Sequence, residues 1–523
     1  MKKILLINPS ANLNRTTPDI LVDYQRKLIL GVAPAVPLGI ICLGTYLKAK
    51  GFSVQLIDSR LYAEDEFFKI LKKEIDQAFL VGISVMTTYV EETLSILKFV
   101  KDHNPAVKTV LGGIHPSLFP EQTARHSLVD FVVFGEGELP LEAVAEKLLA
   151  GDQSFEQIDN ICFEKEGTVF FRKVLKFVDL NEIPVCDYEL IDIERYITRR
   201  FQDQRWGRML EYQSSRGCPS RCSFCVNTII SQRRWRQKDP ARVIREVALL
   251  KDRFKLDHIF FIDENFFPKK ENVMTITDGI KPLALTWEAN VRADYFNDRY
   301  ITNDFMRILA SRGLTINRMG IESGSPETLK LLKKDITPEE ILNAVRISAG
   351  NNIFTMTSFM IGLPGEKKQD VVDTLDIMHQ MEVIGGDNLV INGPQVFRPY
   401  PGGELYELCK QKGLAEPESF DQWAQFSPIK TGYIDDFNWV RDKSFVKEVV
   451  LLRSIAQDAK AQRENWSLLR KIVRGFFYPL VRFRVRHSFY NALIDMKLAY
   501  LLKTSLRKDS SGKKGKIEPG EMS

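Results

Sequence analysis

Three cysteines that lie within eight residues are the most chemically distinctive feature of this sequence. Cys218, Cys222 and Cys225 have the spacing Cys-x3-Cys-x2-Cys. Three thiolates this close on one loop can hold one face of a cubane iron–sulfur cluster and leave one iron open for substrate chemistry. The alternative is a structural zinc site, but zinc normally takes four ligands. The nearest further cysteine, Cys186, lies 32 residues upstream of Cys218.

Composition and length limit the class of protein. The chain has 523 residues, 44% hydrophobic and 27% charged, and its seven cysteines are an odd number. These values are typical of a globular protein of several domains and exclude a fibre, a disordered chain and a secreted disulfide scaffold. No run approaches the ~18 apolar residues that span a bilayer. The apolar start, Lys3–Ile7, stops at Asn8, which is too early for a signal peptide. We therefore expect a cytoplasmic protein.

In the first 150 residues short apolar strands alternate with helices, and these elements would position the residues of a binding site. We expect strands at 3–7, 52–57, 79–85, 107–111 and 131–134, and helices at 38–50, 89–103 and 139–149. This alternation predicts an α/β fold whose N-terminal part is a doubly wound parallel sheet. Ligands of such sheets bind beyond the carboxyl ends of the strands. The candidate binding residues there are Ser84, Thr87, Thr88, Gly112, Gly113, His115, Gly135, Glu136 and Gly137. The alternative is that these residues only make tight turns, since no Gly-x-Gly-x-x-Gly is present.

The cysteine spacing, with Phe224 before the last cysteine, resembles the radical S-adenosylmethionine (SAM) superfamily. The N-terminal part resembles the cobalamin-binding domain of the cobalamin-dependent branch, through Gly112-Gly113-Ile114-His115-Pro116-Ser117 and Gly135-Glu136-Gly137-Glu138. The resemblance runs from about residue 1 to 405. It implies a Rossmann-like cobalamin-binding domain followed by a partial (β/α)6 barrel. The implied cofactors are a [4Fe-4S] cluster, SAM and cobalamin.

The resemblance also implies roles for residues at the ends of the barrel strands. Asp263 and Glu264 would lie near the methionine amino group, Arg292 would pair with the methionine carboxylate, and Glu322 in Glu322-Ser323-Gly324 would bind the ribose or the amino acid end. The segment Gly362-Leu363-Pro364 would surround the adenine. Each residue alone fits a surface ion pair or a turn equally well. Their occurrence in family order at strand ends favours a binding site.

The mechanism implied by the resemblance starts at the open iron, where one electron cleaves SAM to a 5′-deoxyadenosyl radical that abstracts hydrogen from an unactivated C–H bond. Methyl transfer follows if methylcobalamin faces the substrate radical. Many cobalamin proteins carry Asp-x-His-x-x-Gly, whose histidine binds cobalt, and none of the six histidines here fits that motif. We therefore expect cobalt without a histidine ligand from this chain, with His115 lining the binding loop.

The expected domains are 1–150 (cobalamin-binding), 151–204 (a connector with a small hairpin), 205–404 (barrel), 405–507 (helical) and 508–523 (a disordered basic tail). The net charge is +5, and residues 463–523 hold 14 Lys or Arg against 5 Asp or Glu. Basic and aromatic residues alternate from Trp466 in amphipathic spacing, which is typical of a peripheral membrane contact. The alternative is a helical subdomain packed on the barrel.

We predict a cobalamin-dependent radical SAM enzyme, most simply a methyltransferase acting on an unactivated carbon of a small-molecule or lipid substrate. The expected electron donor is a flavodoxin or ferredoxin, and no nucleic acid partner is expected. The first alternative is a cobalamin-binding radical cyclase, oxidase or carbon–carbon coupling enzyme. The second is a non-catalytic sensor whose basic tail binds nucleic acid. A methylthiotransferase is disfavoured, because only Cys42 and Cys162 precede residue 180.

Overall fold

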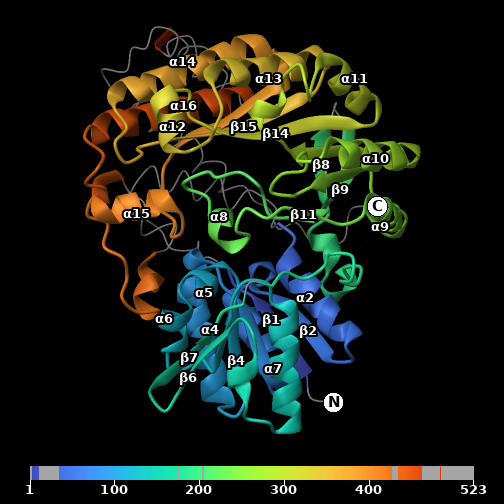
Figure 1. Cartoon of the computed structure of the whole chain (residues 1–523), viewed down its shortest axis with the longest axis vertical. Helices are drawn as coiled ribbons and strands as arrows, with labels where there is room; N and C mark the ends of the chain where they lie inside the picture. Colours follow the sequence, from blue (N-terminus) through green and yellow to red (C-terminus); the bar gives the residue numbers. More distant parts are fainter. Residues whose placement is uncertain are drawn as a thin grey trace, which may run out of the picture.

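In the part of the chain that the structure describes, two seven-stranded sheets and one small two-stranded ribbon form the framework. The computed structural model describes residues 3–10, 35–174, 176–202, 205–426, 434–461 and 483–484. In Figure 1 the first sheet and its helices make the lower half of the molecule, and the second sheet makes the upper half. Helix α8 (Asn227–Ile230) and strand β11 (Arg236–Gln237) lie between the two halves.

The first sheet has the expected doubly wound form. Its strands are β1 (Lys3–Asn8), β2 (Ser53–Asp58), β3 (Ala78–Ser84), β4 (Lys108–Gly112) and β5 (Phe131–Val133), which pair in parallel in the order β2-β1-β3-β4-β5. The predicted hairpin is also present, as β6 (Ile161–Lys165) and β7 (Thr168–Arg172). It pairs with β5 and so extends this sheet by two antiparallel strands.

The helices of this half are α2 (Leu38–Ala49), α3 (Glu64–Ile75), α4 (Val90–His103) and α7 (Glu138–Ala150), with two short helices, α5 (Ile114–Leu118) and α6 (Pro120–Ala124), after β4. Helix α3 was not expected from the sequence, because most of its residues are charged. Phe67, Leu71 and Ile75 recur every four residues and are all buried. This single apolar stripe is enough to hold a surface helix against the sheet.

The second sheet is the predicted partial barrel. Its strands are β8 (Thr198–Gln202), β9 (Arg205–Tyr212), β12 (His258–Phe261), β13 (Thr286–Asn290), β14 (Leu314–Glu322), β15 (Phe354–Ile361) and β16 (Leu389–Val396). Strands β9 and β12–β16 are parallel and neighbours in chain order, and β8 adds an antiparallel edge. The main helices are α9 (Pro240–Phe254), α10 (Lys270–Ile280), α11 (Asn303–Ser311), α12 (Pro326–Leu331), α13 (Pro338–Gly350) and α14 (Lys368–Gly385).

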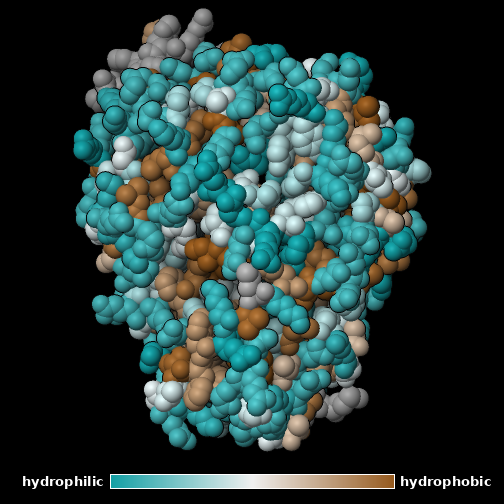
Figure 2. Space-filling view, viewed as in Figure 1, coloured by the Kyte–Doolittle hydropathy of each residue, from teal (hydrophilic) through white to brown (hydrophobic). Residues whose placement is uncertain are grey.

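The C-terminal part is helical as far as it is described, with α15 (Glu404–Gln411) and α16 (Lys443–Ala461). Almost all of the basic segment 463–523 lies outside the described residues, so the membrane interpretation stays a prediction. Within the described ranges, no helix has the length and apolar character needed to cross a bilayer. Figure 2 shows a mainly hydrophilic face with apolar residues scattered over both halves.

A buried aromatic group ties the C-terminal part to the first sheet. The ring of Trp423 lies 5.2 Å from that of His115, and the ring of Phe420 lies 5.5 Å from it. The indole Nε1 of Trp423 donates a hydrogen bond of 2.7 Å to Oε1 of Gln122. The segment after α15 is therefore held on the helices that follow β4.

We expect Trp423→Phe to lower the free energy of unfolding by about 1–2 kcal/mol, because it removes one buried hydrogen bond and part of a packed ring. Urea denaturation measures the change. Gln122→Ala should cost more in the native chain, where it leaves the indole N–H unpaired and also removes the 2.7 Å hydrogen bond from Nε2 of Gln122 to the O of Pro417, and less in the Trp423→Phe background, where only the bond to Pro417 is lost. Additive costs for the two substitutions would contradict this account.

Candidate active site

The three cysteines lie on one loop between the two halves of the protein. Strand β10 (Ser215–Arg216) pairs with β11 and directs the chain into the loop, which we call the cluster loop (Gly217–Val226). The backbone N of Ser223 donates to the O of Leu332 at 2.9 Å, and the N of Leu405 donates to the O of Ser223 at 2.9 Å. The loop is thus attached to the barrel on one side and to α15 on the other.

Gly217 gives the cluster loop its sharp entry. Its φ is +85°, and a Cβ at this position would lie 2.0 Å from the O of Arg234. Only glycine combines a left-handed φ with such a close backbone approach. The turn directs Cys218 away from β10 and toward the carboxyl ends of the barrel strands.

The donor set of the cluster loop suits an iron–sulfur cluster. Cys222 is buried, and Cys218 and Cys225 are half-buried. In the described ranges, no three His, Cys, Asp or Glu side chains are close enough together to hold a single metal ion. A cubane cluster does not need such a group, because each thiolate binds a different iron. Burial raises the pKa of Cys225, so cluster binding would displace a proton from this thiol.

Arg292, which follows β13, points to the cluster loop. Its Nη1 lies 3.7 Å from Sγ of Cys222, its Nε donates to Oδ1 of Asp294 at 2.8 Å, and its Nη2 donates to the O of Lys334 at 2.5 Å. The guanidinium therefore places a fixed positive charge beside one predicted cluster ligand. Its pairing with a methionine carboxylate stays a prediction.

The two predicted acids after β12 have different surroundings. Asp263 is fully buried and accepts hydrogen bonds from the N and Oγ of Ser214, at 3.2 and 2.9 Å, and from Oγ of Ser215. It fastens the strand that leads into the cluster loop. The Oε2 of Glu264 accepts from the N of Gly217 at 3.2 Å. Glu264 is thus the acid that faces the cluster loop itself.

Asp263 should make stability depend on pH. Burial raises its pKa to about 6, although hydrogen bonds from Ser215 and Ser214 oppose the rise. An unfolded aspartate titrates near 3.9, so only the folded protein keeps this proton between about pH 4 and pH 6. The stability that Asp263 contributes must therefore fall as pH rises through this window. We expect Asp263→Asn to remove that part of the decline in urea unfolding. An unchanged pH slope would contradict the assignment.

Lys334 is a site residue that sequence reasoning missed. It is buried, and its Nζ lies 3.6 Å from Oε1 of Glu322 and 5.8 Å from the ring centroid of Phe224. It thus joins the Glu322 segment to the aromatic residue of the cysteine motif. Burial raises the pKa of Glu322, and Lys334 opposes the rise. In the sequence Lys334 is one of two adjacent lysines after α12, a pattern typical of an exposed helix end.

The other two predicted barrel segments are ordered by buried polar contacts. Ser323 exchanges a 2.8 Å hydrogen bond with Thr374 on α14. The Oε2 of Glu366 accepts from the N of Gly362 at 2.5 Å, and the turn Gly362–Pro364 is thereby closed on itself. The indole Nε1 of Trp439 donates to the O of Gly362 at 3.0 Å. These contacts shape a rigid rim at the ends of β14 and β15.

A cavity of about 340 Å³ opens between the first sheet and the cluster loop. The predicted residues in its wall are Ser84, Gly112, Gly113, Gly135, Glu136 and Gly137 from the first half and Glu264 from the second, and Gly217 also lines it. A Cβ at Gly135 would meet nothing within 4 Å, and this glycine has a φ of +74°. A second cavity of about 470 Å³ shares Gly135 and Glu136 with the first. The two cavities adjoin at the turn Gly135–Gly137, which we call the glycine turn. Two adjoining cavities suit a bulky ligand with an extended tail, such as cobalamin.

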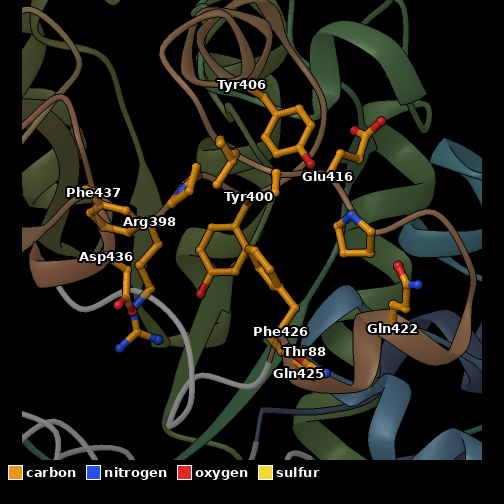
Figure 3. Close-up of a pocket in the computed structure, with 14 residues that line it drawn as sticks. Thr88, Arg398, Tyr400, Tyr406, Glu416, Gln422, Gln425, Phe426, Asp436 and Phe437 are labelled. Atoms are coloured by element: carbon orange, nitrogen blue, oxygen red, sulfur yellow. The ribbon is translucent and has the colours of Figure 1, made fainter.

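Three of the predicted cobalamin residues lie elsewhere. His115 is fully buried in the aromatic group with Trp423, and its Nδ1 lies 3.2 Å from Oγ1 of the buried Thr87. Burial lowers the pKa of His115 to about 3. The short helix after β4 turns this side chain into the core, away from the cavity wall. Thr88 lines a third cavity, of about 420 Å³, with Arg398 and Tyr400 (Figure 3).

Four charged side chains connect the glycine turn to the cluster loop. Arg236 donates to Oε1 of Glu136 at 2.6 Å, and Arg216 donates to Oε1 of Glu136 at 3.2 Å and of Glu138 at 2.7 Å. We call Glu136, Glu138, Arg216 and Arg236 the interdomain ion network. Arg216 directly precedes Gly217, so the network sets the position of the cluster loop over the cavity.

Comparison with known proteins identifies both halves of this site. Residues 32–145 match the B12 binding domain, and residues 212–378 match the radical SAM superfamily. The chain is 28% identical to an uncharacterized methyltransferase of Pyrococcus horikoshii, over 75% of this chain and 82% of that protein. It is 24% identical to the anaerobic magnesium-protoporphyrin IX monomethyl ester cyclase of Rubrivivax gelatinosus, over 75% of this chain and 69% of that protein.

A solved structure shares the fold. It is the structure of the radical SAM methyltransferase TsrM of Kitasatospora setae with tryptophan and a SAM analogue bound. The two folds are similar with a TM-score of 0.63, and the sequences are 19% identical over 83% of each chain. The predicted fold class is thereby confirmed, and the matches to the B12 binding domain and the radical SAM superfamily bear out the predicted cofactors. The roles assigned to individual residues stay predictions.

Proposed function

We propose that the chain is a cobalamin-dependent radical SAM enzyme that transfers a methyl group to an unactivated carbon of a small-molecule acceptor. One observation carries the proposal: the cavity beside the glycine turn of the first sheet is also lined by Gly217 of the cluster loop and by Glu264. Cobalamin held at that turn would lie next to the bound cluster. When bound there, the cluster would supply the electron that cleaves SAM, and cobalamin would supply the methyl group.

The chain's own residues would position these groups. Cys218, Cys222 and Cys225 would bind the cluster, and Arg292 would balance the negative charge of the thiolates. Glu264 and Lys334 would bind polar groups of SAM on either side. Gly112, Gly135 and Gly137 would let the corrin ring approach the backbone. The buried rim at Gly362 would exclude water from the reacting carbon.

The acceptor is proposed to bind in the third cavity. Its wall combines Thr88 from the first half, Arg398 and Tyr400 after β16, and Phe426 from the C-terminal part. The rings of Tyr400 and Phe426 lie 5.9 Å apart, and Figure 3 shows Tyr400 in the middle of the lining residues. Polar and aromatic side chains alternate around this cavity, which suits an acceptor with a planar or apolar body and polar substituents.

The remaining partners follow from the chemistry. Reduction of the cluster needs a one-electron donor, and the exposed Arg221 and Arg233 at the cluster loop suit an acidic protein such as a flavodoxin or ferredoxin. A peripheral membrane contact and a lipid acceptor rest on the basic segment 463–523, nearly all of which is outside the described residues.

The test uses the full chain reconstituted anaerobically with iron, sulfide and hydroxocobalamin. With dithionite and SAM labelled in its methyl group, we expect both 5′-deoxyadenosine and a labelled product from a panel of aromatic, phosphorylated and fatty acyl acceptors. A product heavier by one methylene unit supports methyl transfer. A product that has lost hydrogen and carries no label would instead support a cyclase or oxidase, which the Rubrivivax gelatinosus relative favours.

A further inference from the structure

Two cysteines that the proposed chemistry does not use meet behind the cofactor cavity. Cys42 lies on α2 and Cys186 lies two residues before the turn Tyr188–Leu190. Their Sγ atoms are 2.6 Å apart although 144 positions separate the residues, and both are free thiols in this structure. Neither lies in the cluster loop.

Hydrogen bonds beside the two cysteines fix the backbone near Cys186 to α2. The backbone N of Asp187 donates to Oγ1 of Thr45 at 2.8 Å, and Nζ of Lys48 donates to Oδ2 of the same aspartate at 2.8 Å. The backbone next to Cys186 is therefore fixed to α2 whether or not the sulfurs are bonded. A disulfide has an S–S distance of about 2.05 Å, so only a small movement separates the two states.

The surroundings make one of the two thiols reactive. A hydrogen bond from Cys186 lowers the pKa of Cys42 to about 7, against burial and with help from Arg216 and Lys238. The same hydrogen bond and burial raise the pKa of Cys186. Cys42 also lines the 340 Å³ cavity, which gives a small oxidant a route to it. A thiol with a lowered pKa that is reachable from a cavity is the kind that oxidises first.

We propose that Cys42 and Cys186 are a redox-active pair that forms a reversible disulfide when a peroxide enters the cofactor cavity. The Cys42 thiolate attacks one peroxide oxygen and becomes a sulfenic acid, and the other oxygen leaves as water after protonation. The Cys186 sulfur then attacks the Cys42 sulfur and expels a second water. The pair gives two electrons and two protons, and the peroxide is reduced to two waters. A small-molecule dithiol reduces the disulfide back to the two thiols and is itself oxidised to a disulfide.

The disulfide would join α2 to the segment that connects the two halves, on the wall of the cobalamin cavity. It would therefore report oxidising conditions at the place where the oxygen-labile cofactors bind. The inference needs only the two thiols and the cavity. It stands independently of whether the enzyme methylates its acceptor.

The test treats the full-length reconstituted protein with hydrogen peroxide, blocks the remaining thiols with iodoacetamide in denaturant, and maps the peptides by mass spectrometry. We expect a cross-linked peptide that contains Cys42 and Cys186 and that disappears after dithiothreitol. It should form at least about ten times faster than any product at Cys162 or Cys409, because burial raises the pKa of each of those thiols to about 12.

Cys42→Ser and Cys186→Ser should each abolish the cross-link and leave the partner thiol free for alkylation or overoxidation. Cys162→Ser is the matched control, since it changes a buried thiol away from the pair and should leave the cross-link unchanged. The proposal is overturned if both thiols are alkylated in oxidised native protein. It is equally overturned if Cys42 is linked to a cluster cysteine instead of Cys186.

Discussion

Replacing Cys222 by alanine should reduce the formation of 5′-deoxyadenosine from SAM by more than about 100-fold, since loss of a residue that merely supports a metal ligand already costs about 10–100-fold. Cys222 is the buried member of the three cysteines and the one that Arg292 contacts at 3.7 Å. Its removal leaves only two thiolates for the cluster, while Arg292 keeps its contacts with Asp294 and Lys334. Iron content, the visible absorption of the cluster and the yield of 5′-deoxyadenosine under dithionite measure the effect.

The matched control for this prediction is Cys409→Ala. Cys409 is also buried and lies on α15, the helix whose start is hydrogen-bonded to the cluster loop, but it is not part of the motif. The control should keep its iron and its SAM cleavage while it loses a similar side-chain volume. If Cys222→Ala retained a full cluster and native SAM cleavage, the assignment of the three cysteines would be wrong.

The second large effect is expected in the interdomain ion network. Arg216→Met removes the arginine partner of the buried Glu138 and one of the two arginine partners of Glu136, which keeps Arg236. Removing one partner of a buried ion pair typically costs 3–5 kcal/mol, and partial exposure of Arg216 reduces this to about 3 kcal/mol here. Because Arg216 directly precedes the cluster loop, hydroxocobalamin should also bind more weakly. Urea unfolding and the absorbance of bound cobalamin after gel filtration measure the two effects.

Arg221→Met is the matched control, because Arg221 lies in the cluster loop, near Arg216 in the sequence, but pairs with Asp335 on the surface, where both side chains are about half exposed. It should change the free energy of unfolding by no more than about 1 kcal/mol. If the two substitutions changed the free energy of unfolding equally, the interdomain ion network would contribute no more to stability than a surface ion pair does.

The network should also respond to acid. Burial alone would raise the pKa of Glu136, but Arg236 and Arg216 outweigh burial and hold this pKa below its usual range. The stability that Glu136 contributes is therefore complete above the usual glutamate pKa and is lost only as pH falls through the lowered value.

The local elements of the first sheet could be predicted well because each depends on its own residues. The run Lys3–Ile7 is apolar enough to be a buried strand, and in the second sheet β15 likewise has the predicted bounds, Phe354–Ile361. Helix α3 could not be predicted from its own residues in this way, because its buried apolar stripe consists of only three residues. The hairpin was predicted as a unit, but its pairing with β5 depends on residues about 30 positions away.

The sequence by itself determined the cluster motif, the order of strands and helices and the glycine turns, because these depend on residues close together in the chain. Only the tertiary structure decided which predicted residues share a site. It placed Glu264 beside Gly217 while it turned His115 into an aromatic core, and it brought Cys42 to Cys186. These outcomes depend on side-chain direction and on contacts between distant segments, where burial and pairing are settled by packing and not by local sequence.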